Sequence, residues 1–156
     1  MRILDKAGIS YNTYYYEWKD DFIDGVAVAE QIGRPSKQVY KTLVAQGVSG
    51  AYYVFIIPVE TELELKAAAR AVNEKAVEMI KVKDLTKVTG YIRGGCSPIG
   101  MKKEYISVLD SSAILLKTII ISAGKPGHQM ELSPDDLVRL ISCKVEDIAF
   151  KKTMHI

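Results

Sequence analysis

One run of nine residues, Ala51–Val59, is apolar almost throughout and limits the folds open to this chain. A strand of that composition is covered on both faces, which places it at the centre of a sheet. A second apolar stretch, Val39–Ala45, is joined to it by the turn residues Gln46–Gly50. The sequence therefore predicts two joined strands at the core of the fold.

The remaining helical and strand patterns follow one another irregularly. Helices are expected over residues 1–7, 24–32, 62–73, 81–89 and from 133 onward, and strands over 11–17, 76–80, 105–109, 117–122, 129–132 and 145–149. Regular alternation would indicate a parallel doubly wound sheet. Its absence favours an α+β fold, with a mixed sheet surrounded by helices, in one domain spanning residues 1–156.

Charge and cysteine content exclude several classes of function. The net charge is +2, from 21 basic and 19 acidic residues, so a nucleic-acid partner would be held at a small spot such as an end. The cysteines, Cys96 and Cys143, show no disulfide or metal-site spacing, and the two histidines exclude a His-rich metal centre. Without a signal sequence or a long apolar run, we expect a cytoplasmic protein with no metal and no membrane partner.

Residues 89–103 form a glycine-rich stretch that holds four of the eleven glycines. Glycine lets the backbone adopt conformations closed to other residues and lets a ligand approach the main chain closely. Pro98 fixes its own φ and biases Ser97 away from helix. Such a loop can direct N–H groups at a phosphate, a hydroxyl or a carbonyl oxygen that gains negative charge. A tight turn between two strands explains the same pattern, and by itself a loop of this composition is a weak signal of binding.

Polar residues inside or beside the apolar stretches are candidates for chemistry. Lys41 lies within a strand, where a lysine either faces solvent or is held in a pocket as a charge for a developing oxyanion. Thr42, on the opposite face, is expected to pack in the core or the sheet. Neither Ser97 nor Ser122 lies in a Gly-x-Ser-x-Gly elbow, so both are interpreted as hydrogen-bonding groups.

Other candidates have two readings each. Cys96 is either a nucleophile, if a neighbouring cation lowers its pKa, or a small residue that fits the loop. His128 is either a base or a packing residue. Tyr14 and Tyr16 share a strand face and either stack on a ligand or belong to the core and its rim. Five lysines in and just before the glycine-rich stretch either bind phosphates or form a solvated face: Lys81, Lys83, Lys87, Lys102 and Lys103.

Several of these segments, in order over nearly the whole chain, resemble the YbaK/EbsC family. Its members are bacterial single-domain proteins similar to the editing domain inserted in prolyl-tRNA synthetases. The matching segments are Val39–Leu43, Thr89–Tyr91 with Gly94–Gly100 and Lys102–Lys103, and Ser122–Lys125 followed by Glu131–Leu132. The resemblance implies a barrel-like central sheet and no cofactor. It also implies the 3′ end of an aminoacyl-tRNA as partner, with prolyl-tRNA synthetase as a candidate second partner.

The resemblance also implies roles for single residues. Lys41 would hold the substrate and stabilise charge near the scissile ester. Gly94, which opens the Gly-x-x-x-Pro pattern closed by Pro98, would present backbone groups to the terminal ribose and carbonyl; these two are the catalytic positions. The implied substrate-binding residues are Tyr16, Thr42, Gly95, Ser97, Pro98, Ser122 and Gln129. In the family the nucleophile is the substrate's own cysteine thiol, which attacks its ester carbonyl and leaves as a thiolactone. The enzyme then needs only to orient this thiol against the ester carbonyl.

Two positions depart from the family pattern. Gln129 stands where well-studied members have an aspartate, and Asp24 where they have a phenylalanine. The implied function is deacylation in trans of Cys-tRNA(Pro) or Cys-tRNA(Cys). One alternative is a deacylase for alanyl or seryl esters, which lack a thiol and need a bound water. Another is a non-catalytic regulatory protein that binds aminoacyl-tRNA.

Overall fold

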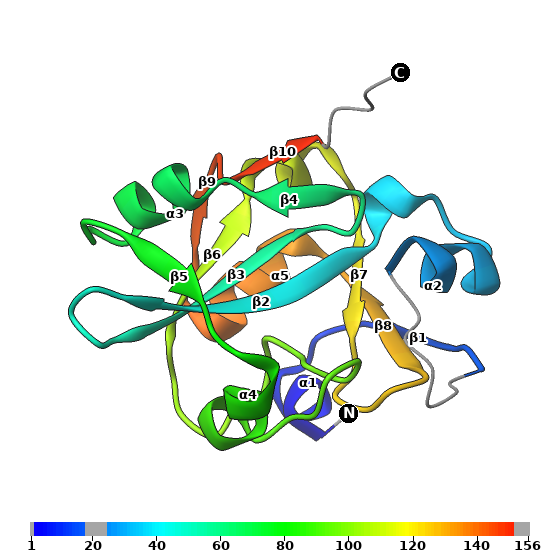
Figure 1. Ribbon diagram of the computed structural model, residues 1–156. Helices are drawn as coiled ribbons and strands as arrows, with labels where there is room; N and C mark the ends of the chain where they lie inside the picture. The colour runs from blue at the N-terminus through cyan, green and yellow to red at the C-terminus, as the bar shows by residue number, and fades with distance from the viewer. Residues whose placement is uncertain (1, 18–24, 152–156) are drawn as a thin grey trace.

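The computed structural model describes residues 2–17 and 25–151, whose strands form three sheets (Figure 1). The largest sheet has the order β5 (Val77–Met79), β2 (Tyr40–Gly47), β3 (Tyr52–Pro58), β6 (Ile106–Asp110) and β9 (Lys144–Glu146). A three-stranded sheet has the order β1 (Asn12–Tyr15), β8 (His128–Leu132) and β7 (Ile119–Ser122). The third sheet pairs β10 (Ala149–Lys151) with β4 (Thr61–Leu63).

The centre of the large sheet is the predicted pair of apolar strands. β2 and β3 pair antiparallel from Tyr40 opposite Pro58 to Gln46 opposite Tyr52. On the other side of β3, β6 is parallel, so the sheet is mixed. All residues of β3 after Tyr52 are buried, as its apolar composition requires.

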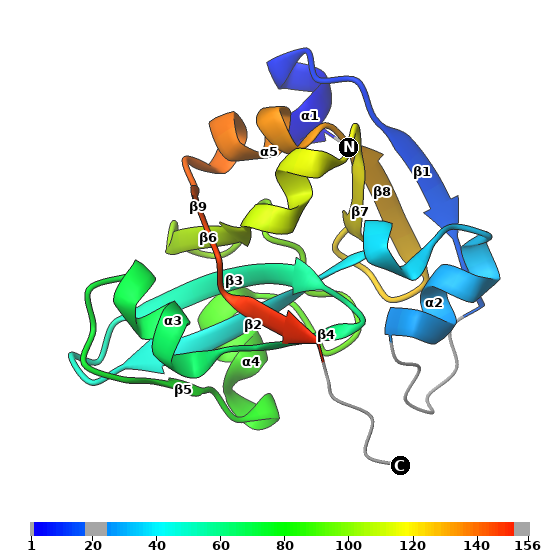
Figure 2. The same ribbon diagram turned by 90° about the horizontal axis from the view of Figure 1, so that it is seen from above.

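Helices cover the sheets from two sides (Figures 1 and 2). They are α1 (Arg2–Ala7), α2 (Gly25–Ile32), α3 (Leu65–Ala71), α4 (Val82–Thr89) and α5 (Pro134–Ile141), with short 3₁₀ turns η1 (Ser36–Gln38) and η2 (Ser111–Leu115). α3 packs Ala68 and Ala69 against one face of the large sheet, and that sheet's other face shares a core with β7 and β8. α2 lies over the outer face of the three-stranded sheet, where Ala29 contacts Ile120 and Val39.

The expected mixed α+β fold is confirmed, but the barrel-like closure is not. Each sheet of the described strands is open, and the two larger sheets meet through an isolated parallel bridge between Val39 and Ile120. The opening has a local cause in β5, which pairs only with Ala45–Gly47 at the end of β2. Among the described strands, none therefore pairs with this edge of β2 at residues 41–43.

Two further differences from the sequence prediction follow from side-chain bonds to the backbone. The helix expected over 62–73 begins only after Glu64, whose carboxylate accepts bonds from the N–H groups of Lys66 and Ala67 and caps it. The single strand expected over 145–149 is divided into β9 and β10. The side chain of Asp110, from the end of β6, accepts from the N–H groups of Ile148 and Ala149 and interrupts the strand there.

Other expectations concern the ends of elements and the membrane. Asp24, the first residue of the helix expected over 24–32, and His155, one of the two histidines, lie outside the described residues. No helix within ranges 2–17 and 25–151 combines the length and apolar character needed to cross a membrane.

Candidate active site

A cavity of about 390 Å³ opens at the unpaired edge of β2. Its size lies in the range of small-molecule sites. Its wall consists of Tyr16, Gly25, Val28, Val39, Tyr40, Lys41, Thr42, Leu43, Val59, Gly94, Cys96, Ser122 and Gln129. Six of the nine residues implied by the family resemblance are therefore brought together, from five separate stretches of the chain. A larger hollow of about 730 Å³, between β5 and the start of α4, holds none of them.

Lys41 and Gly94, the two residues expected at the reaction centre, line this cavity together. Lys41 is half-buried on β2, so its strand does not simply expose it to bulk solvent. Gly94 has a φ of 88°, a left-handed conformation that favours glycine. The Tyr16 hydroxyl donates to the Gly94 carbonyl at 3.4 Å, which links the end of β1 to the glycine loop.

Thr42 borders the cavity at the open edge of β2. The N–H of Val59 donates to the Val39 carbonyl, whereas the N–H of Ile80 donates to the Val44 carbonyl on the other edge. Alternate residues of a strand direct their backbone groups to opposite edges, so Thr42 directs its N–H and C=O away from β3. Among the described strands none pairs with β2 at this point.

The side chain of Thr42 is directed elsewhere. It shares a strand face with Tyr40 and Val44, which belong to the core between the two sheets. Its hydroxyl oxygen is buried and finds no hydrogen-bond partner within the described part of the chain. Thr42 therefore offers its main chain to the cavity, while its hydroxyl is enclosed.

The three-stranded sheet contributes neutral polar groups to the wall. Ser122 and Gln129 are directly opposite each other on β7 and β8. Gln129 is 6% exposed, and the Ser122 hydroxyl accepts from the N–H of Gly124 at 3.2 Å. The described lining thus contains one cation, Lys41, and no carboxylate.

Three residues expected at the site lie behind its wall. A Cβ at Gly95 would approach the Cδ of Pro126 to 2.7 Å, so the two Gly/Pro loops pack directly on each other there. Ser97 is fully buried, and its hydroxyl accepts from the N–H of Ile99. Pro98 lines a separate hollow of about 250 Å³. These residues shape the loop that carries Gly94.

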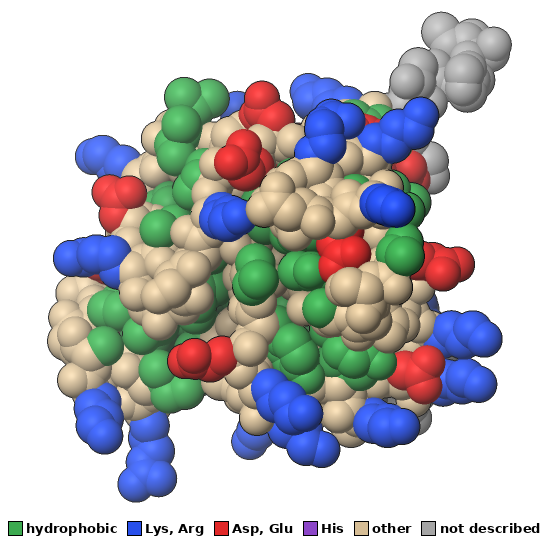
Figure 3. Space-filling view, turned by 90° about the vertical axis from the view of Figure 1, so that its left-hand side faces the viewer, with side chains coloured by type: hydrophobic (Ala, Val, Ile, Leu, Met, Phe, Trp, Pro, Cys, Tyr) green, Lys and Arg blue, Asp and Glu red, His purple; other side chains and the backbone are tan. Residues whose placement is uncertain are grey.

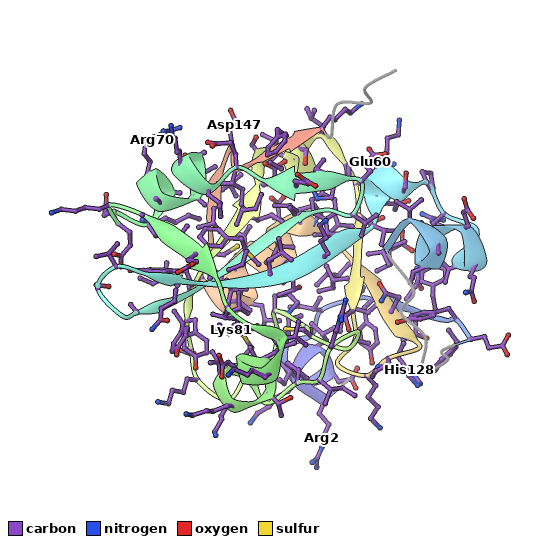
Figure 4. The ribbon with its side chains drawn as sticks, in the orientation of Figure 1. Arg2, Glu60, Arg70, Lys81, His128 and Asp147 are labelled. Atoms are coloured by element: carbon purple, nitrogen blue, oxygen red, sulfur yellow. The ribbon has the colours of Figure 1, made fainter. Side chains whose placement is uncertain are left out.

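Cys96, the candidate nucleophile, and His128, the candidate base, lie in different places. Cys96 lines the cavity, but burial raises the pKa of its thiol to about 11, against the opposing effect of a hydrogen bond with Thr89. The thiol is therefore protonated at neutral pH and is a poor nucleophile. His128, labelled in Figure 4, does not line the cavity; the centroids of its ring and the Tyr15 ring lie 4.9 Å apart, edge to face.

Sequence reasoning missed the contribution of α2 to the cavity. Gly25 and Val28 from this helix line it, together with Val59 from the end of β3. A Cβ at Gly25 would lie 2.3 Å from the Cγ1 of Val59, so the helix approaches that residue as closely as a glycine permits. A glycine in the first turn of a helix, where it disfavours the helix, is the available signal.

Residues 24–140 match the family described as "Aminoacyl-tRNA editing domain". The chain belongs to the aminoacyl-tRNA editing domain family. It is also 41% identical, over 97% of its own length and 93% of the relative's, to the Enterococcus faecalis protein named "Putative Cys-tRNA(Pro)/Cys-tRNA(Cys) deacylase EbsC".

Solved structures show the same fold at lower identity. The structure titled "Crystal structure of hypothetical protein APE2540" has a TM-score of 0.85 at 19% identity and covers 96% of this chain and 97% of that one. A structure titled "Crystal structure of a putative trans-editing enzyme for prolyl tRNA synthetase" has a TM-score of 0.80 at 21% identity, with 97% and 94% covered.

This editing domain carries its charge unevenly. Residues 81–103, which include the loop of Gly94, hold six of the 21 basic residues and one acid, Asp84. The rest of the sequence therefore holds 15 basic and 18 acidic residues. The six form an exposed set that we name the basic face: Lys81, Lys83, Lys87, Arg93, Lys102 and Lys103. Lys and Arg side chains gather along the lower edge of the molecule in Figure 3, on the side where Figure 4 labels Lys81 and Arg2.

Proposed function

We propose that the protein is an aminoacyl-tRNA deacylase that acts in trans on mischarged tRNA, with Cys-tRNA(Pro) and Cys-tRNA(Cys) as its main substrates. The observation that carries this proposal is the cavity that holds Lys41 and Gly94 together. Membership of the editing-domain family and 41% identity to a relative named as such a deacylase support it.

The chemistry requires no nucleophile from the protein. The substrate's thiol loses its proton, and its sulfur forms a bond to the carbonyl carbon of its own ester. The bond from that carbon to the ribose oxygen then breaks. The ribose oxygen takes up a proton, and cysteine leaves as a thiolactone that water later opens. The protonated Cys96 thiol is consistent with this route, because it does not compete for the ester.

The cavity supplies orientation and charge. The Lys41 ammonium would stabilise the negative charge that develops on the carbonyl oxygen. The open-edge N–H of Thr42 is a second donor on the same wall. Thiol and carbonyl already belong to one molecule, so the cavity has only to hold the bonds between them in a near-attack geometry.

The basic face would bind the backbone of the acceptor stem beside the cavity. Phosphate contacts of this kind fix register without reading sequence. Selection among tRNAs would then come from a partner, for which prolyl-tRNA synthetase in the cytoplasm is our candidate. Adding the synthetase should raise the rate with Cys-tRNA(Pro) and leave the rate with Cys-tRNA(Cys) unchanged.

The decisive experiment measures release of amino acid from tRNAs charged with cysteine, serine or alanine. We expect release from the cysteinyl esters and a loss of about 100-fold or more in kcat for Lys41→Ala. The matched control is Lys66→Ala, an exposed lysine on α3 that does not line the cavity.

Other outcomes identify the alternatives. Release from seryl or alanyl esters at a similar rate would indicate attack by water. Binding of an aminoacyl-adenosine analogue that Lys41→Ala weakens, without turnover of any ester at stoichiometric enzyme, would indicate a non-catalytic regulatory protein. Equal activity of the two lysine variants would refute the role of Lys41.

A further inference from the structure

Glu131 is a buried carboxylate that does not line the cavity and has no role in the chemistry above. It lies on β8 and is 6% exposed. Its Oε1 accepts from the Tyr14 hydroxyl at 2.6 Å. Its Oε2 accepts from the Arg34 guanidinium at 2.9 Å, the Gln38 amide at 3.0 Å and the Thr118 hydroxyl at 2.5 Å.

These donors belong to the parts of the chain that hold the two sheets together. Tyr14 is on β1 and Thr118 directly precedes β7, whereas Arg34 and Gln38 lie between α2 and β2. An ionised carboxylate can accept about four hydrogen bonds, and these four donors account for that number. Burial raises its pKa, but the bonds from Thr118 and Tyr14 and the charge of Arg34 outweigh burial and hold the pKa of Glu131 below its ordinary value.

The carboxylate lies at the contact between the two larger sheets. Glu131 is directly opposite Ile120 in the three-stranded sheet. Ile120 forms the parallel bridge with Val39, and Gln38 is the residue before Val39. A bond from Gln38 to Glu131 therefore fastens the large sheet to the three-stranded sheet at the bridge itself.

The cavity lies next to this contact, because Val39 of the bridge is one of its lining residues. Gln129 lies two residues from Glu131 on β8, and Tyr16 lies two residues from Tyr14, which corresponds to about 7 Å along a strand. Lys41 lies three residues after Gln38. The large sheet thus supplies Lys41, and the other sheet supplies the neutral groups that face it.

We propose that Glu131 is a positioning residue, which sets the distance between Lys41 and the cavity groups of the three-stranded sheet. When glutamine replaces Glu131, the ion pair with Arg34 is lost and one oxygen remains to accept in place of two, so the start of β2 can shift relative to β8. Misplacement by about 1 Å can cost a catalytic site about 100-fold in rate. The expected effect on turnover rests on the proposed function, but the expected effect on Lys41 does not.

Glu131→Gln is the test variant, because it keeps the size of the side chain and removes its charge. The matched control is Glu74→Gln. Glu74 accepts from the hydroxyls of Tyr53 and Ser49, each at 2.5 Å, but it packs beside Gly47 at the other end of β2. Both variants lose a carboxylate that binds two or more side chains, and only one loses the sheet contact.

Two readouts separate positioning from general stability. The first is kcat and KM for Cys-tRNA(Pro). The second is the NMR signal of Lys41 after reductive ¹³C-methylation, assigned by its loss in Lys41→Arg; methylation keeps the charge of the lysine. Both are measured where unfolding curves show each variant to be folded. We expect Glu131→Gln to lower kcat about 10-fold or more with little change in KM, and to move the Lys41 signal. Glu74→Gln should do neither.

The proposal is overturned if Glu131→Gln matches Glu74→Gln in both readouts. If wild-type protein releases no amino acid from any ester, the proposed function fails and the Lys41 signal alone decides the positioning role. If Glu131→Gln does not fold, Tyr14→Phe replaces it, since this variant removes one donor to Glu131 and keeps the ring. An unmoved Lys41 signal in Tyr14→Phe would then refute the proposal.

Discussion

Replacing Thr42 by valine should stabilise the protein, although a threonine-to-valine change inside a protein usually costs stability. The usual cost arises because a hydrogen-bonded hydroxyl is lost. Here the hydroxyl oxygen is buried and has no hydrogen-bond partner among the described residues. Folding therefore removes this hydroxyl from water without forming a hydrogen bond, which destabilises the native state. Such a group costs about 1–3 kcal/mol in protein mutational data.

We expect Thr42→Val to raise the free energy of unfolding by about 1 kcal/mol, near the lower end of that range. For a chain of 156 residues this corresponds to a rise in Tm of about 2–4 °C. The two side chains have nearly the same shape, and valine is also favoured in strands. Urea titration with a fluorescence readout would give the free energy directly.

Activity is expected to stay within about twofold of wild type, because the substitution leaves the Thr42 N–H on the open edge of β2 unchanged. Thr42→Ser is the matched control: it keeps the unpartnered hydroxyl, deletes a methyl group, and should lower stability by about 1 kcal/mol. A less stable Thr42→Val protein would refute the structural reasoning. A stable one with a tenfold lower kcat would show that the hydroxyl binds substrate.

The remaining predictions concern the cavity wall, its thiol, acid pH and salt. Gly25→Ala should cost about 1–3 kcal/mol in a denaturant titration, because its Cβ would lie 2.3 Å from Val59. Cys96→Ser should keep its kcat between pH 6 and 8, since the pKa of the thiol is raised to about 11. Because the pKa of Glu131 is lowered, its stabilisation is complete above the ordinary value of 4.5 and is lost as pH falls through the folded value; the unfolding free energies of wild type and Glu131→Gln should therefore converge in acid. Lys102→Ala should reduce the slope of log Kd for tRNA against log salt by about 1.

The fold could be predicted where one segment determines its own surroundings. Ala51–Val59 is apolar enough to require cover on both faces, and it forms the central strand. The break between β9 and β10 depends instead on Asp110, which is 38 residues from the N–H of Ile148 that it binds. Spacing within a short window carries no information about such a bond.

The site divides in the same way. Lys41 could be singled out because a lysine is unusual in an apolar strand. The fate of Ser97 depends on packing between distant loops, and it is buried although Gly94 and Cys96 beside it reach the cavity. The bonds of Glu131 span 93 residues to Gln38 and 117 to Tyr14, so no local pattern could reveal them.

The uneven charge of the molecule affects how it meets a polyanion. With a net charge of only +2, the protein has little attraction for nucleic acid at long range, yet the basic face concentrates six positive charges in residues 81–103. Near an RNA, such a local charge favours encounters in which the residues around Gly94 approach the phosphates. Added salt should then slow association much more than it speeds dissociation. A weakly charged enzyme of this kind can sample many tRNAs rapidly and retain none of them for long.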